Sequence, residues 1–261
     1  MAIEIESRTV DTQDLERRVK EMYREVADEP HKEFHFEVGR ALAERLGYPS
    51  AELDAIPSEA IESFAGVGYY FDLAAIRPGE TVVDLGSGSG MDSFLAARQV
   101  GAAGRVIGID MTDAQLEKAT GLARTHGLAN VEFRNARIEE LPLEEASADV
   151  VISNGVVNLS PAKERVFAEA ARVLRRGGRL AIADIVTNTQ LPATVTCDAS
   201  LWAACIGGAM QRDDYRNAIE SAGFEIEDIK DNDQYRFISE RAENATRKYG
   251  VKSVSLLAVK G

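Results

Sequence analysis

From about residue 80 onward, short apolar runs alternate with longer stretches in which apolar residues recur every three or four positions. The short runs are rich in β-branched residues and are typical of buried strands, whereas the wider spacing is typical of amphipathic helices. The pattern predicts strands at 81–85, 105–110, 130–134, 149–153 and 179–186. It predicts helices at 91–100, 112–126, 161–175 and about 210–222. Such alternation indicates a parallel sheet with helices on both faces.

The pattern changes after Gly223. Segments 224–229 and 253–259 alternate as strands and are predicted to pair antiparallel, and the long polar segment 230–250 between them is expected to be an inserted loop and helix. The predicted fold class is therefore α/β: a doubly wound, mostly parallel sheet of seven strands whose last strand is antiparallel.

The N-terminal region has a different rhythm. Residues 11–47 show helical periodicity, which Pro30 divides and Gly47 ends. We expect residues 1–79 to form a helical N-terminal extension or cap, and residues 80–261 to form the main domain.

One stretch organises the main domain: the predicted first strand runs directly into three glycines and then a helix, in the sequence Thr81-Val-Val-Asp-Leu-Gly-Ser-Gly-Ser-Gly90. Glycine accepts positive φ and has no side chain to block a ligand, so this turn lets the backbone come close to a nucleotide. A second strand ends on Asp110, twenty residues after the last glycine, where a nucleotide-binding βαβ unit places the acid that binds ribose hydroxyls. Without a ligand, the same glycines would simply make a tight turn.

The exact spacing separates two cofactor classes. A dinucleotide fingerprint requires its third glycine at position 91, where this chain has Met91, so a dehydrogenase on the same sheet is disfavoured. Asp84, the three glycines and Asp110 together resemble the S-adenosylmethionine (SAM) site of class I methyltransferases, which implies a Rossmann-like class I sheet and SAM as cofactor.

Under that resemblance each strand end has a role at the carboxyl edge of the sheet. The glycine loop lies along the methionine part of SAM, Asp110 binds the ribose, and Met111 covers the adenine. Thr112 with Gln115 is predicted to form a capping box for the helix that follows. The expected cofactor-binding residues are Asp84, Gly86, Ser87, Gly88, Gly90, Asp110, Met111, Asn135, Ala136, Arg137, Ile138 and Asn154.

The region after the fourth strand bears on the methyl acceptor. It reads Ile152-Ser-Asn-Gly-Val-Val-Asn-Leu-Ser160 and lacks the Pro-Pro-aromatic motif that holds a planar amine. No histidine lies nearby to act as a base for a hydroxyl. A soft nucleophile held in line with the sulfonium needs less help, and carbon and amine nucleophiles stay open.

A second unusual stretch, Trp202-x-x-Cys205-Ile-Gly-Gly-Ala-Met210, makes the resemblance more specific. Together with Asn154–Ser160 and Phe64-Ala-Gly-Val-Gly68 it resembles the arsenite SAM methyltransferase family, from roughly residue 30 to the end. The family binds trivalent arsenic through cysteine thiolates. Cys205, at the family's cysteine before Gly-Gly, and Asn154, which follows the fourth strand where the methyl group would face its acceptor, are the candidate catalytic residues.

The resemblance is incomplete at the thiolates. Where the family has further cysteines, this chain has Val67, Gly155 and Val157. Cys197 could replace them only if the chain turns before Cys205, because eight residues of continuous helix would separate the two by about 12 Å.

Composition narrows the partners. The 261-residue chain has a net charge of −13, which disfavours nucleic acid and anionic membranes as partners. Two cysteines and the absence of a signal-peptide pattern indicate a cytoplasmic protein. His31 and His35 lack a third ligand, so no metal site is expected. The chain is expected to be a monomer or homodimer.

These observations predict a SAM-dependent methyltransferase that acts on a small molecule through a soft or organic nucleophile. Two alternatives stay open. One is a true arsenite methyltransferase that uses Cys205 and Cys197. The other is a non-catalytic SAM-binding or metalloid-sensing protein.

Overall fold

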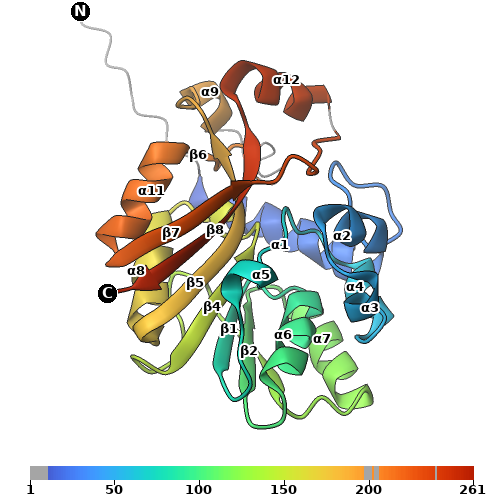
Figure 1. Cartoon of the computed structure of the whole chain (residues 1–261). Coiled ribbons are helices and arrows are strands. Elements are labelled where there is room, and N and C mark those ends of the chain that lie inside the picture. The colour runs from blue at the N-terminus through green and yellow to red at the C-terminus, as the bar shows by residue number, and fades with distance from the viewer. Residues whose placement is uncertain (1–10, 197–201, 203–205, 239) are drawn as a thin grey trace, which may run out of the picture.

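The computed structural model describes residues 11–196, 202, 206–238 and 240–261, and in this part of the chain the strands form one sheet in the order β3-β2-β1-β4-β5-β8-β7 (Figure 1). Neighbours from β3 to β5 run parallel, whereas β8 is antiparallel to both β5 and β7. The short β6 adds parallel pairing at the end of β5. The strands are β1 Thr81–Leu85, β2 Arg105–Asp110, β3 Val131–Asn135, β4 Ala148–Asn154, β5 Leu174–Thr187, β6 Met210–Gln211, β7 Phe224–Asp231 and β8 Lys252–Lys260. The predicted fold class is confirmed, with β6 as an addition.

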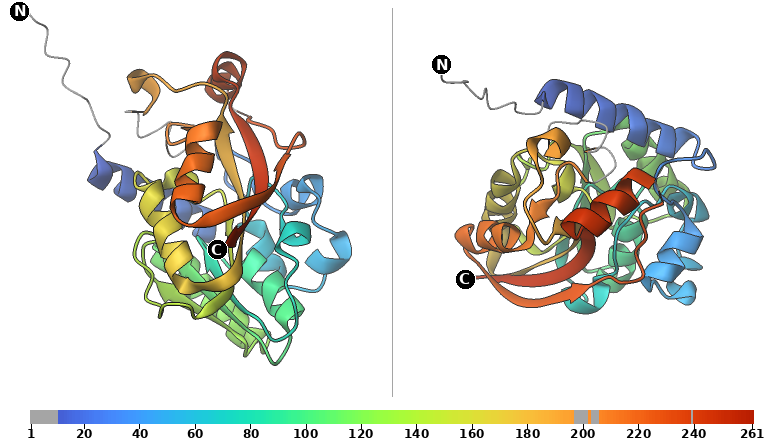
Figure 2. Two further views of the ribbon diagram at one scale, coloured as in Figure 1. Left: turned by 60° about the vertical axis from the view of Figure 1, so that its left-hand side comes forward. Right: turned by 90° about the horizontal axis from the view of Figure 1, so that it is seen from above.

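Helices cover both faces of this sheet (Figure 2). Alternate residues of β1 point to opposite layers, so that Val82 packs with α6 and the N-terminal helices whereas Val83 packs with α8 and α11. The helices are α1 Thr12–Asp28, α2 Arg40–Leu46, α3 Ser50–Leu53, α4 Ser58–Glu62, α5 Phe71–Ala74, α6 Met91–Val100, α7 Asp113–Thr125, the 3₁₀ turn η1 Val157–Leu159, α8 Lys163–Val173, α9 Ala193–Thr196, α11 Arg212–Ser221 and α12 Glu240–Tyr249.

The N-terminal region shares the core of the sheet. Leu15 of α1, Leu42 of α2 and Tyr70 are buried in the same cluster as Phe94 of α6. Helix α1 packs along α7, which places it beside the carboxyl ends of β1 and β2 (Figure 2). This packing brings α1 to the site described below.

Two local expectations were wrong in part. The helical region 11–47 is divided at Pro30 and ends at Gly47 as predicted, but the second helix begins only at Arg40 and residues 29–39 are not helical. Pro30 disfavours helix at the residue before it, and Gly39 begins α2 with a φ of 88°, which ordinary residues avoid. His31 and His35 therefore do not share a helix face. Strand β5 also begins earlier than expected, at Leu174, because the turn around Gly177 is absorbed as a bulge in its pairing with β4.

The predicted capping box does not form. Thr112 is the N-cap of α7, but its hydroxyl makes no cap hydrogen bond. The Gln115 side chain instead accepts a hydrogen bond from Ser89 Oγ and donates one to the Tyr23 carbonyl. The glutamine is taken by tertiary partners, which a local cap rule does not consider.

Close packing around Gly68 gives a stability prediction. A Cβ at this position would lie 2.2 Å from Asn232 Nδ2 and 2.8 Å from Ala183 Cβ. We expect Gly68→Ala to lower the free energy of unfolding by about 1–3 kcal/mol, the usual cost of overpacking. Denaturant unfolding measures it. Gly121→Ala, in an α7 position with nothing within 4 Å, is the control and should stabilise by about 0.5–1 kcal/mol. Equal effects of the two substitutions would contradict the prediction.

Candidate functional site

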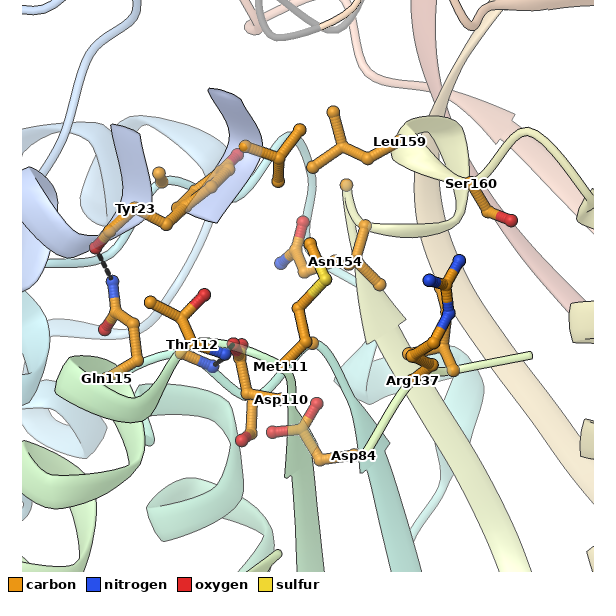
Figure 3. A pocket seen from close by; sticks show the side chains of 18 of the residues that line it. Tyr23, Asp84, Asp110, Met111, Thr112, Gln115, Arg137, Asn154, Leu159 and Ser160 are labelled. Atoms are coloured by element: carbon orange, nitrogen blue, oxygen red, sulfur yellow. Dashed lines mark hydrogen bonds between the residues drawn. The ribbon is translucent and has the colours of Figure 1, made fainter. Parts of the chain in front are cut away.

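A pocket of about 1160 Å³, including its part open to solvent, lies at the carboxyl ends of β1, β2 and β4 (Figure 3). Its floor is the loop between β1 and α6, and its sides come from the segments after β2, β3 and β4 and from α1. Of the residues expected to bind a cofactor, those in the lining are Asp84, Gly86, Ser87, Gly88, Asp110, Met111, Ala136, Arg137, Ile138 and Asn154.

The glycine loop is anchored to β2. The N–H groups of Gly86 and Ser87 both donate to the Ile109 carbonyl, at 2.8 and 3.0 Å. Gly86 has a φ of 70°, and a Cβ there would lie 2.5 Å from Cβ of Val156. Gly90 has a φ of 94° and starts α6, but it faces aromatic rings rather than the pocket. Glycine is thus required at both ends of the loop, for contact with the chain after β4 and for the entry into α6.

Asp110 closes the loop from the other side. Its carboxylate accepts hydrogen bonds from Gly88 N at 3.0 Å and Thr112 N at 2.8 Å. Burial raises the pKa of Asp110. Two backbone donors leave further lone pairs on the carboxylate, so it can accept ribose hydroxyls from the pocket.

Asp84 lies deeper, with 2% of its surface exposed. It accepts a hydrogen bond from Ser93 Oγ at 2.6 Å. Burial, followed by the negative charges of Asp92 and Asp110, raises the pKa of Asp84 to about 8. A positively charged ligand would favour the ionised form.

A buried polar cluster beside the pocket was missed by sequence reasoning. Asp92, in the first turn of α6, accepts hydrogen bonds from Tyr48 OH at 2.8 Å and Tyr70 OH at 2.7 Å. The Asn154 amide donates to the same carboxylate at 3.2 Å. Burial raises the pKa of Asp92. The available signals were the nearness of Asp92 to Gly90 and the aromatic stretch before β1.

Asn154 is held entirely by protein groups. Its Oδ1 accepts from the N–H of Val67 at 2.7 Å and of Gly68 at 3.3 Å. Its Nδ2 lies 3.0 Å from the Gly68 carbonyl and 3.0 Å from Tyr48 OH, besides its contact with Asp92. The side chain therefore fastens the loop 64–68 to the end of β4.

The segment after β3 divides into two parts. Ala136, Arg137 and Ile138 line the pocket, and the Ala136 N–H donates to the Asp110 carbonyl at 3.1 Å. Asn135 is exposed, lies outside the lining and donates to Asp113 Oδ1.

Helix α1 forms a wall that the sequence pattern did not indicate. Its lining residues are Thr12, Leu15, Glu16, Val19 and Tyr23. Arg137 forms an ion pair with Glu16, and Gln115 Nε2 donates to the Tyr23 carbonyl at 2.8 Å, so α1 is tied to the opposite sides of the pocket (Figure 3).

Loop 64–68 and the segment after β4 form the part of the pocket that we call its far end, and its lining includes the apolar residues Phe64, Val156 and Leu159. Val67 lies behind it against Gly155, where a Cβ would be 3.3 Å from Val67 Cγ1. Val157 packs in the opposite layer of the core. Positions 67 and 155 therefore meet, whereas position 157 faces away.

The cysteine stretch is only partly described. Cys197 and Cys205 lie outside the described residues. Ile206 is fully buried, and a Cβ at Gly208 would lie 2.1 Å from the Asn158 carbonyl. The described end of this stretch thus packs on η1, next to the far end of the pocket. The described residues contain no cluster of three or more His, Cys, Asp or Glu able to hold a metal ion.

Comparison with known proteins identifies the chain as a methyltransferase-domain protein. A methyltransferase-domain model matches residues 76–223. An arsenite methyltransferase of Halobacterium salinarum is 44% identical over 199 residues, covering 76% of this chain and 51% of the relative. The chain thus spans about half the length of the curated relatives it matches.

Solved structures of methyltransferases also resemble this chain. An arsenic(III) S-adenosylmethionine methyltransferase from Chlamydomonas reinhardtii superimposes with a TM-score of 0.69 at 31% identity, covering 85% of this chain and 74% of that one. A geranyl diphosphate methyltransferase solved with GPP and sinefungin has a TM-score of 0.66 over 96% of this chain and 99% of its own, but at 21% identity it supports the fold alone.

Proposed function

The chain belongs to the methyltransferase-domain family and is a class I SAM-dependent methyltransferase that resembles arsenite methyltransferases, and from this premise we propose that it methylates a small molecule through a soft or organic nucleophile. Bound SAM supplies an electrophilic methyl group on a sulfonium. The remaining question is which acceptor the pocket takes.

The pocket has the features that SAM requires. The glycine loop leaves backbone accessible, Asp110 keeps acceptor capacity for ribose hydroxyls, and the Met111 side chain lies in the lining as a cover for adenine. We assign Asp84, Gly86, Ser87, Gly88, Ala136 and Ile138 to the same site. Asn135 points to Asp113, so it contributes through its backbone position only.

The contact between Val67 and Gly155 carries the acceptor proposal. In the resemblance to arsenite methyltransferases, both positions belong to cysteines. Here a branched aliphatic side chain packs against a glycine that has no side chain, so neither position offers sulfur to a soft ion. This apolar packing lies directly behind a lining that includes the apolar residues Phe64, Val156 and Leu159, and an apolar lining favours an organic acceptor.

The residues of this chain act mainly by positioning. Loop 64–68, fastened by Asn154, shapes the far end of the pocket. We therefore assign Asn154 a positioning role in place of the catalytic role expected from the sequence. Holding the acceptor in line and dry supplies the acceleration, and no strong base is needed for a soft nucleophile.

The net charge of the chain and the hydropathy of its helices support the proposal of a small-molecule methyl acceptor. The net charge of −13 opposes binding of nucleic acid. Within the described residues, no helix is long and apolar enough to cross a membrane.

Methyl transfer from labelled SAM tests the proposal. We expect little transfer to arsenite with glutathione, and transfer to members of a panel of thiol and carbon acids. Val67→Cys is the matched variant, because it returns one thiolate at a family position and should increase arsenite binding. Cys205→Ser and Cys197→Ser test the alternative.

Three outcomes separate the candidates. Arsenite turnover in the wild type that disappears in both serine variants would establish a relocated thiolate site and overturn the organic acceptor. SAM binding without turnover on any acceptor would favour the SAM-binding or metalloid-sensing alternative. Turnover on an organic acceptor alone supports the proposal.

A further inference from the structure

The carboxylates at the floor of the pocket have only neutral hydrogen-bond donors in the described part of the chain. Asp84 accepts from a serine, Asp110 from backbone N–H groups, and Asp92 from two tyrosines and an amide. The cation in the pocket lining, Arg137, contacts Glu16 and Glu139 instead. The floor therefore carries the buried acids Asp84 and Asp92 and the half-buried Asp110, without a compensating positive side chain bound to them.

Asp92 differs from the other two acids in what its donors hold. Tyr48 follows the Gly47 cap of α2 and Tyr70 precedes α5, and both are at most 2% exposed. Asn154 holds the backbone of loop 64–68 through Val67 and Gly68. Asp92 thus connects the first turn of α6, next to the glycine loop, with the segments that form the far end of the pocket.

The strength of these bonds depends on the charge of Asp92. Hydrogen bonds to an ionised carboxylate are about twice as strong as bonds to a neutral acceptor. Burial without a cation raises the pKa of Asp92 and disfavours the ionised form. A cation bound in the pocket acts in the opposite direction and stabilises the carboxylate.

We propose that Asp92 is a positioning residue through which the positive charge of the bound cofactor tightens loop 64–68, so that cofactor binding completes the acceptor end of the pocket. The inference rests on SAM as the cofactor and on the placement of the acceptor end in the proposed function. SAM carries a sulfonium and an ammonium, whereas S-adenosylhomocysteine keeps only the ammonium. The loop should therefore be tighter before methyl transfer than after it, which favours product release.

Hydrogen exchange of a peptide covering 62–72 tests the proposal, because it contains the N–H groups that bind Asn154. In the wild type, saturating SAM or sinefungin should slow its exchange by about tenfold, as expected for strengthened charge-assisted bonds, and S-adenosylhomocysteine should slow it less. The side chain introduced by Asp92→Asn stays neutral, so SAM should no longer slow the exchange of this peptide. Calorimetry confirms that the SAM concentration used saturates the variant.

Matched variants distinguish a coupling between cofactor binding and loop 64–68 from a merely structural role of Asp92. Asp113→Asn, an exposed aspartate outside the pocket, should behave as wild type. Tyr70→Phe removes one donor without changing the lining and should reduce the SAM effect, which keeps the proposal testable if Asp92→Asn fails to bind SAM.

The proposal is overturned by a full SAM effect in Asp92→Asn or Tyr70→Phe. It is also overturned if Asp92→Asn speeds exchange by the same factor with and without SAM, which would mean that Asp92 merely supports the fold. No acceptor enters the experiment, so its failure is distinct from failure of the proposed function.

Discussion

Replacing Arg179 by methionine is expected to lower the free energy of unfolding by about 3–5 kcal/mol, because it leaves a buried carboxylate without its partner. Arg179 on β5 and Glu80, just before β1, form an ion pair at 2.7 Å with side chains only 13% and 9% exposed. Arg179 Nε also donates to the Ala74 carbonyl at 2.8 Å, and Glu80 accepts from the Arg77 N–H. The pair joins the sheet to the N-terminal segment.

Denaturant unfolding of two further variants gives the controls. The double variant Glu80→Met/Arg179→Met removes both charges and should recover much of the loss. Arg105→Met breaks a pair with Glu132 whose side chains are 52% and 44% exposed, and should cost no more than about 1 kcal/mol. A loss below 1 kcal/mol for Arg179→Met would contradict the expectation.

Asp110→Ala is expected to weaken SAM binding by about 1.5–3 kcal/mol, or roughly tenfold to 150-fold, the scale for hydrogen bonds to a charged group. The variant loses the carboxylate that we propose as the ribose acceptor, and it also removes the partner of the Gly88 and Thr112 N–H groups, which shape the loop. Isothermal titration calorimetry measures the change.

Two comparisons make the Asp110 result specific. Asp113→Ala removes a carboxylate three residues away that lies outside the pocket, and should leave SAM affinity unchanged. Asp110→Asn keeps the shape and one acceptor oxygen, and should fall between alanine and wild type. Unchanged affinity in Asp110→Ala would refute our placement of the ribose.

The local sequence pattern was enough to predict the elements on both sides of the glycine loop. The strand 81–85, the helix 91–100 and the strand 105–110 were predicted with the bounds that the structure has. Their period-2 and period-3.6 patterns are properties of neighbouring residues, and the glycine turn is a steric requirement of the chain itself. Residues 31–38 were predicted less well, because a helical pattern there was broken by Pro30 and Gly39 and replaced by a loop.

Contacts between residues that are distant in the sequence could not be predicted from local patterns. The bonds of Tyr48 and Tyr70 to Asp92 join residues 44 and 22 positions apart, and the ion pair of Arg137 with Glu16 makes α1 a wall of the pocket. Thr112 and Gln115 matched a local capping rule, yet tertiary partners took the glutamine.

By itself, then, the sequence determined the class I sheet and the glycine turn that leads from β1 into α6, and it supplied the proposals that Asp110 binds the ribose and that positions 67 and 155 differ from the cysteines of the arsenite methyltransferase family. Only the tertiary structure decided that these two positions touch while 157 faces the other layer, and that the Asn154 side chain is hydrogen-bonded to loop 64–68. The physical reason is range: turns and periodicity depend on adjacent residues, whereas burial and hydrogen-bond partners depend on which distant segments the sheet brings together.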